Sequence, residues 1–141
     1  MSQAAELLSS ARTELNARCN AVEEAYEFML AYAGQGLANE AGSAKGGQVR
    51  EYLAKAEAAL SGLSTVVASF AGSANDPVLA PYAAFMDVID RDARAARAAI
   101  GVVLAQTSIS SQLIDNLNAS IHLRALLTDL FLVDEALKGL K

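Results

Sequence analysis

The chain has little of several residue types that often mark a function or a cellular compartment. Among its 141 residues are one cysteine, one histidine, two prolines and no tryptophan. A single cysteine cannot form an internal disulfide, which is compatible with a reducing compartment. The first residues, MSQAAE, lack the basic region and apolar stretch of a secretory signal peptide. We therefore expect a cytoplasmic protein that is stabilised by packing rather than by disulfides.

Charged residues are also scarce, and uninterrupted apolar runs are short. The chain carries 11 basic and 16 acidic residues, which gives a net charge of −5. Binding to nucleic acid or to an anionic membrane needs clustered cations, so we expect neither kind of partner. The longest charge-free stretches, residues 58–75 and 98–114, are interrupted by polar residues or glycine. They do not predict a membrane span.

What the chain does have is a high apolar content. Hydrophobic residues make up 53% of the sequence and charged residues 19%, against about 25% charged residues in typical globular domains. The mean hydropathy is +0.26. This is more apolar surface than a small solvated monomer needs, and it predicts a homo-oligomer or a protein partner.

Apolar residues recur at steps of three and four along most of the chain, which predicts amphipathic helices. The predicted helices cover residues 2–33, 48–70, 77–106 and 110–140. Residues 34–47 carry five glycines and no periodic apolar pattern, so they predict an exposed loop. The length fits one domain. The predicted fold is an all-α, up-and-down antiparallel four-helix bundle.

The junction at residues 107–111 determines whether this topology is possible. It contains one threonine and three serines but neither glycine nor proline. Serine and threonine compete for backbone hydrogen bonds and favour turns and helix caps, so a turn is predicted. The alternative is that the third and fourth helices fuse into one long helix, which could bury its apolar faces only in an intertwined oligomer.

The last predicted helix has two apolar faces that lie roughly opposite each other. Its first half places Ile114, Leu117 and Ile121 on one face. A straight helix must then change neighbours midway, so either it kinks near residues 120–124 or one face packs outside the bundle. The segment 123–133 is apolar nearly all round, and it is the predicted intermolecular surface. The alternative is that two helices of the same bundle cover both faces. The candidate interface residues on the second face are Leu123, Leu126, Leu130, Val133 and Leu137.

Aromatic and methionine side chains near the end of the first helix suggest a pocket for a small apolar ligand. The candidate pocket residues are Phe28, Met29, Tyr32 and Met86. The alternative is that these side chains form ordinary core. In the predicted bundle, residues 28–39 and 98–114 meet at one end, and both segments are free of charge. An uncharged end would suit a docking surface or a pocket mouth.

Few residues could carry chemistry. Cys19 lies on the apolar stripe of the first helix, where it is expected to behave as a small buried hydrophobe. His122 shares a polar face with Asp115 and Asn118, which favours an exposed histidine. Arg91 and Arg94 each have an aspartate four residues earlier, whereas Arg97 does not, so Arg97 is a candidate anion contact. No Glu-x-x-His motif is present, and we predict no catalytic residue, metal site or cofactor.

These observations favour a non-enzymatic helical module for protein interaction or assembly, such as an oligomeric subunit, an adaptor or a small chaperone. The alternative is a helical bundle that binds a small apolar ligand or chromophore in its interior. The excess of apolar residues is compatible with both functions, and no motif in the sequence separates them.

Overall fold

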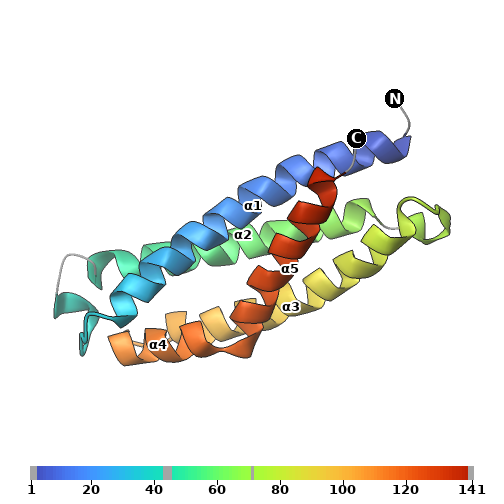
Figure 1. The fold of residues 1–141 in the computed structure, drawn as a ribbon. Helices are drawn as coiled ribbons and strands as arrows, with labels where there is room; N and C mark the ends of the chain where they lie inside the picture. The colour runs from blue at the N-terminus through green and yellow to red at the C-terminus, as the bar shows by residue number, and fades with distance from the viewer. Residues whose placement is uncertain (1–2, 43–45, 71, 140–141) are drawn as a thin grey trace.

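The computed structural model describes residues 3–42, 46–70 and 72–139, and this part of the chain is all-helical. Three 3-10 turns accompany the α-helices: η1 (Glu40–Gly42), η2 (Gly46–Gln48) and η3 (Ser73–Asn75). Figure 1 shows the long helices lying alongside one another, while the last helix crosses the others at an angle. The described α-helices are α1 (Gln3–Ala33), α2 (Val49–Ser69), α3 (Ala80–Leu104), α4 (Ser111–Ala119) and α5 (Ile121–Lys138).

The long helices form where the apolar spacing predicts them. On α1, Leu15 and Val22 are buried, and the helix ends at Ala33, directly before Gly34. On α2, Leu53, Leu60 and other apolar residues spaced three or four apart face the core. α3 begins at Ala80, three residues later than predicted. The Asp76 carboxylate instead accepts the backbone N–H of Val78 at 2.9 Å and holds a turn before the helix.

The predicted turn between the third and fourth segments is confirmed. α3 ends at Leu104 and α4 begins at Ser111, so the two segments do not fuse into one helix. Ser110 is the N-cap of α4, and its hydroxyl accepts the backbone N–H of Leu113 at 3.0 Å. Ile109, within the turn, is fully buried. The serines cap the helix while the isoleucine anchors the turn to the core.

The prediction of one continuous helix over residues 110–140 is wrong, because the segment breaks at Ser120, and the alternative of a kink near residues 120–124 is confirmed. This residue is the C-cap of α4 and the N-cap of α5, with φ −58° and ψ 129°, an extended conformation. The break lets Ile114 and Leu117 of α4 face the core, and it also turns the opposite face of α5 inward. Because a continuous helix would leave one of these apolar faces exposed, the break resolves the conflict seen in the sequence.

The connection between α1 and α2 packs against the end of the helices. Leu37, at its centre, is half-buried and bonds to Ser111 in both directions, with N···O distances of 2.9 and 2.8 Å. The loop was predicted to be exposed because it is rich in glycine, but this part of it is bound to α4. Residues 43–45 of the predicted loop lie outside the described residues.

Candidate functional site

The structure places all five candidate interface residues in the core of a single chain. Leu123 and Leu126 are fully buried, and the most exposed of the five is only 2% exposed. They form the inner face of α5, which packs against α3 and α1. The expectation that this face meets another molecule is therefore corrected. The break at Ser120 gives α5 a direction in which its leucine-rich face covers the other helices.

The opposite face of α5 is open to solvent and carries large apolar side chains. Ile121 is 73% exposed, Phe131 50% and Leu132 59%. Polar residues at steps of three and four complete the same side of the helix. We call this surface the outer face of α5, and it consists of Ile121, Arg124, Thr128, Phe131, Leu132, Glu135 and Lys138.

The outer face could have been recognised from one signal in the sequence. Residues 123–133 are apolar nearly all round the helix, so one side must face solvent or a partner when the other is buried. Sequence reasoning chose the wrong side, because the leucine stripe is the more regular of the two. The choice depends on the direction of α5 after Ser120, and a periodic pattern does not specify that direction.

Three of the four candidate pocket residues are buried in the core, and Phe28 is half-buried against it. Met29, Tyr32 and Met86 are at most 1% exposed. Phe28 stacks on Tyr52 of α2 with ring centroids 4.2 Å apart. The Tyr32 hydroxyl donates to the Ile109 carbonyl at 2.6 Å, and burial, followed by the nearby Glu40 charge, raises the pKa of this phenol. This aromatic group joins α1 to α2 and to the turn before α4.

An ion pair lies at the end of the molecule that was expected to be uncharged. Arg50 donates from Nε to Oε2 of Glu40 at 2.7 Å and from Nη2 to Oε1 at 2.8 Å. Arg50 also donates to the carbonyls of Leu104 at 3.0 Å and Gln106 at 2.6 Å, where α3 ends. Glu40 accepts the N–H of Ile109 at 2.9 Å. The segments meet there as predicted, but Glu40, which directly follows the first segment, and Arg50 of α2 bring charge to the contact.

Two further side chains tie α4 to α1 at this end. Ser111 Oγ donates to the Tyr32 carbonyl at 2.7 Å, and Asn118 Nδ2 donates to the Met29 carbonyl at 3.1 Å. Both side chains are buried, and buried polar groups stabilise a fold only when they are hydrogen-bonded. We call the whole set the polar clasp; its side-chain members are Tyr32, Glu40, Arg50, Ser111 and Asn118.

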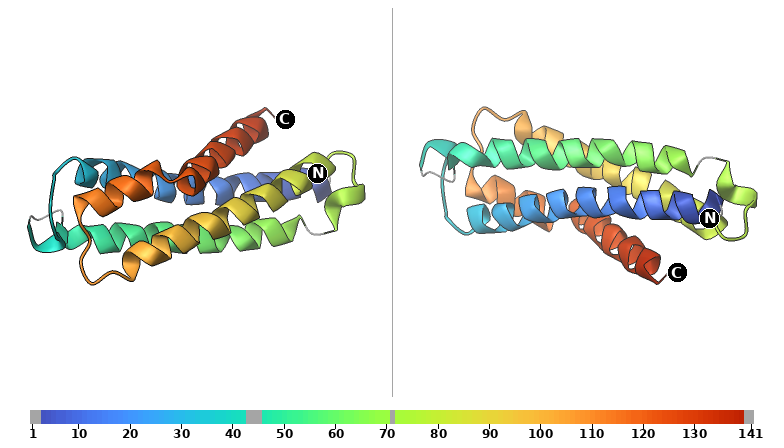
Figure 2. Two further views of the ribbon diagram at one scale, coloured as in Figure 1. Left: turned by 90° about the horizontal axis from the view of Figure 1, so that it is seen from below. Right: turned by 90° about the horizontal axis from the view of Figure 1, so that it is seen from above.

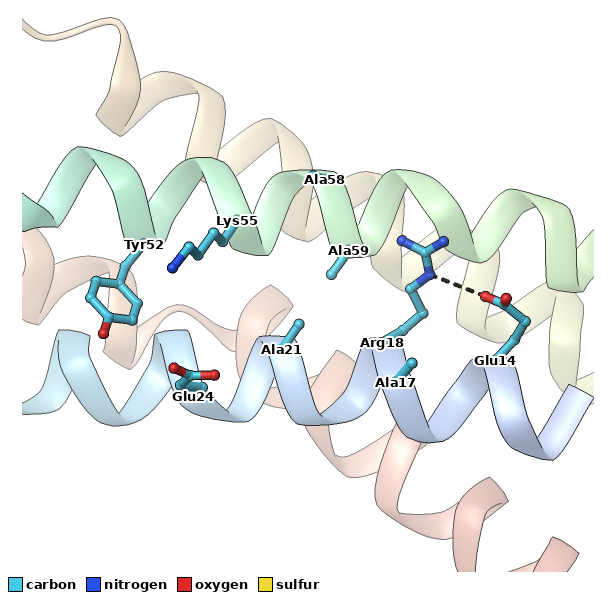
Figure 3. A pocket seen from close by; sticks show the side chains of 9 residues that line it. All are labelled: Glu14, Ala17, Arg18, Ala21, Glu24, Tyr52, Lys55, Ala58 and Ala59. Carbon is cyan, nitrogen blue, oxygen red and sulfur yellow. Dashed lines mark ion pairs between the residues drawn. The ribbon is translucent and has the colours of Figure 1, made fainter.

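A groove of about 360 Å³ runs between α1 and α2 (Figure 3). Alanines from both helices form its floor. In Figure 3, Arg18 reaches from α1 toward α2, and its Nε lies 3.4 Å from Oε2 of Glu14. The guanidinium occupies the place where a Cβ at Gly62 would be, so this glycine allows the arginine to cross the groove. The rim residues are Glu14, Arg18, Glu24, Tyr52 and Lys55.

Two carboxyl groups face each other where α5 packs on α3. Burial, followed by the hydrogen bond and the charge of Asp92 on α3, raises the pKa of Asp129 on α5 to about 7. Burial and the nearby like charge disfavour the ionised form of Asp129, so Asp129 keeps its proton up to near-neutral pH. No basic side chain contributes to this shift.

The remaining candidate groups do not converge on one another. Cys19 is 6% exposed, as predicted, and its thiol donates to Oε1 of Glu23 at 3.3 Å. Burial, then the Glu23 hydrogen bond, raises the pKa of Cys19 to about 12, so the nucleophilic thiolate does not form near neutral pH. His122 is exposed at the start of α5. Arg97 is half-buried on α3, and its Nε has no hydrogen-bond partner within the part of the chain that the structure describes.

Comparison with protein-family models, with curated proteins and with solved structures gave no match to this chain. In the described ranges, no three side chains among histidine, cysteine, aspartate and glutamate are grouped so that they could hold a metal ion. No helix in the same ranges has both the length and the apolar character needed to cross a membrane.

Proposed function

We propose that this chain is a non-enzymatic helical module that associates through the outer face of α5, in the first place with another copy of itself. The observation that carries the proposal is the exposure of Ile121, Phe131 and Leu132 on one side of a single helix. Burying half-exposed aromatic and aliphatic side chains is favourable by about 25 cal/mol per Å² of apolar area. The low proportion of charged residues points in the same direction.

The proposal includes an architecture in which α4 and α5 together serve as the fourth helix of an antiparallel four-helix bundle. The polar clasp joins α4 to the end of α1, and the inner face of α5 covers α3 and α1. The bundle then presents the outer face on a helix that already has a packed support. We further propose that the module works in the cytoplasm, where its one buried thiol needs no disulfide partner.

The test is the mass of the assembly in solution, measured by sedimentation velocity over a wide range of protein concentration. We expect the wild-type chain to form a reversible oligomer. The double variant Phe131→Ser/Leu132→Ser should sediment as a monomer while keeping its helical circular dichroism. Val102→Ser is the matched control, since Val102 is 62% exposed on α3 and lies outside the outer face. A wild-type chain that stays monomeric at every concentration would contradict the proposal.

The alternative proposal is that the chain binds a small apolar ligand. The observation in its favour is the alanine-floored groove between α1 and α2, because the predicted interior site is filled by Met29, Tyr32 and Met86. Native mass spectrometry of protein purified without denaturation would reveal a retained molecule. Ala58→Phe should displace such a molecule by filling the groove, whereas the variant at Phe131 and Leu132 should leave it bound. This pattern would favour the ligand function over association.

A further inference from the structure

The outer face of α5 has the spacing of a coiled-coil seam. Its residues 121, 124, 128, 131, 135 and 138 follow one another at alternating steps of three and four. The central pair is Thr128 and Phe131. Arg124 precedes this pair by the same number of residues as Glu135 follows it. The face therefore carries Arg124 on one side of its centre and Glu135 on the other, with Lys138 one turn beyond Glu135.

We propose that the occupant of the outer face is a second copy of this chain, with the two α5 helices antiparallel about a twofold axis between Thr128 and Phe131. This inference rests on the proposed function and adds to it the orientation of the two copies. The axis places Arg124 of each copy opposite Glu135 of the other. A parallel pair would instead place each charge opposite an identical one, which is destabilising.

Both charges are available to a partner. The Glu135 side chain is 80% exposed, and its ion pair with Lys138 is long, at 3.8 Å. Lys138 lies closer to Asp134, at 3.4 Å. Arg124 is exposed, and within the described residues its side chain forms no ion pair. The antiparallel arrangement can therefore form without breaking a strong ion pair.

The apolar side chains fit the same arrangement. Phe131 of each copy would cover Thr128 of the other at the centre, and Leu132, beside the seam, would close the central layer against water. Ile121 would lie against the methylene stem of Lys138 from the partner copy, since a lysine can bury its stem while its charge stays in water. The three large apolar residues that α5 exposes are then covered in one contact.

The position of α5 leaves room for this contact. In both views of Figure 2 the C-terminal part of α5 diverges from the other helices, so its outer side is not overhung by them. A contact made by one helix face is smaller than the roughly 1,200–2,000 Å² of a standard interface. We therefore expect a dimer that dissociates on dilution rather than a permanent one.

The experiment is a charge reversal read by sedimentation velocity. Arg124→Glu and Glu135→Arg should each weaken dimerisation by about tenfold, because twofold symmetry turns two attractive pairs into two repulsive ones. The combined variant Arg124→Glu/Glu135→Arg should recover the wild-type dissociation constant, since both pairs are restored with their signs exchanged. Glu51→Arg is the matched control, because Glu51 is 62% exposed on α2 and makes a similar surface pair.

The outcomes separate this inference from the proposed function. If the combined variant dimerises no better than either single variant, the antiparallel pairing is wrong. The antiparallel pairing is also wrong if the single variants dimerise like Glu51→Arg while Phe131→Ser/Leu132→Ser is monomeric. In that case the proposal that the chain associates through the outer face still stands. A wild-type chain that never self-associates overturns both. Helical circular dichroism of each variant shows that a lost dimer is not a lost fold.

Discussion

The members of the polar clasp all precede the break at Ser120 in the sequence, and α5 follows it. Different forces hold these two regions to the rest of the chain. The clasp consists of directional bonds: an arginine to a glutamate and two carbonyls, a tyrosine to a turn, and a serine and an asparagine to the end of α1. α5 is held mainly by leucines and a valine, and Asp129 lies near Asp92 of α3 in this contact. Directional bonds fix geometry, whereas apolar burial supplies stability without fixing a direction.

This difference explains where an association surface can be placed. The clasp ties the ends of α1, α3 and α4 through hydrogen bonds that are made inside the chain. On α5 one face supplies all the packing, and the other is left with exposed apolar groups and two charges free to pair. Variants in the two regions should therefore have different effects on stability and opening.

The largest effect should come from the two faces of α5. Leu130 is 1% exposed on the inner face, and Leu130→Ala should lower the free energy of unfolding by about 3 kcal/mol through lost burial and a new cavity. Leu132→Ala, only two residues away, should change it by less than about 0.5 kcal/mol in the monomer. Urea unfolding at low protein concentration measures both. Similar losses would mean that the outer face also packs within one chain.

The next largest loss of stability should come from removing the arginine of the clasp. Arg50→Met should cost about 2 kcal/mol, since it leaves Glu40 and the end carbonyls of α3 without their donor. Hydrogen exchange should speed up at residues 105–111 and stay unchanged along α5. Equal acceleration in both regions would show that the clasp and α5 open together. This result would contradict the view that different forces hold the two regions.

The control for the clasp is Arg50→Met combined with Glu40→Gln. Removing the negative charge as well should recover part of the lost stability, because an unpaired half-buried carboxylate costs more than a missing pair. If the double variant is no more stable than Arg50→Met, the main role of the arginine is to bind the α3 carbonyls rather than Glu40.

The sequence predicted the helical elements well because apolar periodicity is a local property. The turn before α4 was also predictable, since its serines favour helix caps. The long-range partners were not: Glu40 and Arg50 are separated by 10 residues from each other and by more than 50 from the turn they bind. Nor did the pattern specify which face of α5 is buried, because that depends on the backbone angles of one residue, Ser120.

The last comparison concerns the pH dependence of the two regions. The pKa of Asp129 is raised from 3.8 to about 7, so between these values the folded chain binds a proton that the unfolded chain has lost. Stability from this group is therefore full below about pH 4 and declines as the pH rises toward 7. Glu40 behaves in the opposite way, because Arg50 lowers its pKa below the usual 4.5. Stability from Glu40 is present at neutral pH and declines only in acid.

Asp129→Asn separates the two contributions, because the amide stays neutral and can still donate a hydrogen bond to Asp92. Hydrogen exchange, corrected for the intrinsic effect of pH, should show α5 of the wild type opening more readily as the pH rises from 5 to about 7. In the variant this rise should be absent, while the acid loss of protection at residues 105–111 should remain. Asp115→Asn, on α4, is the matched control and should keep the wild-type profile. If α5 of Asp129→Asn still loosens over the same pH range, the carboxyl pair does not control its docking, and the two regions differ in geometry but not in their response to protons.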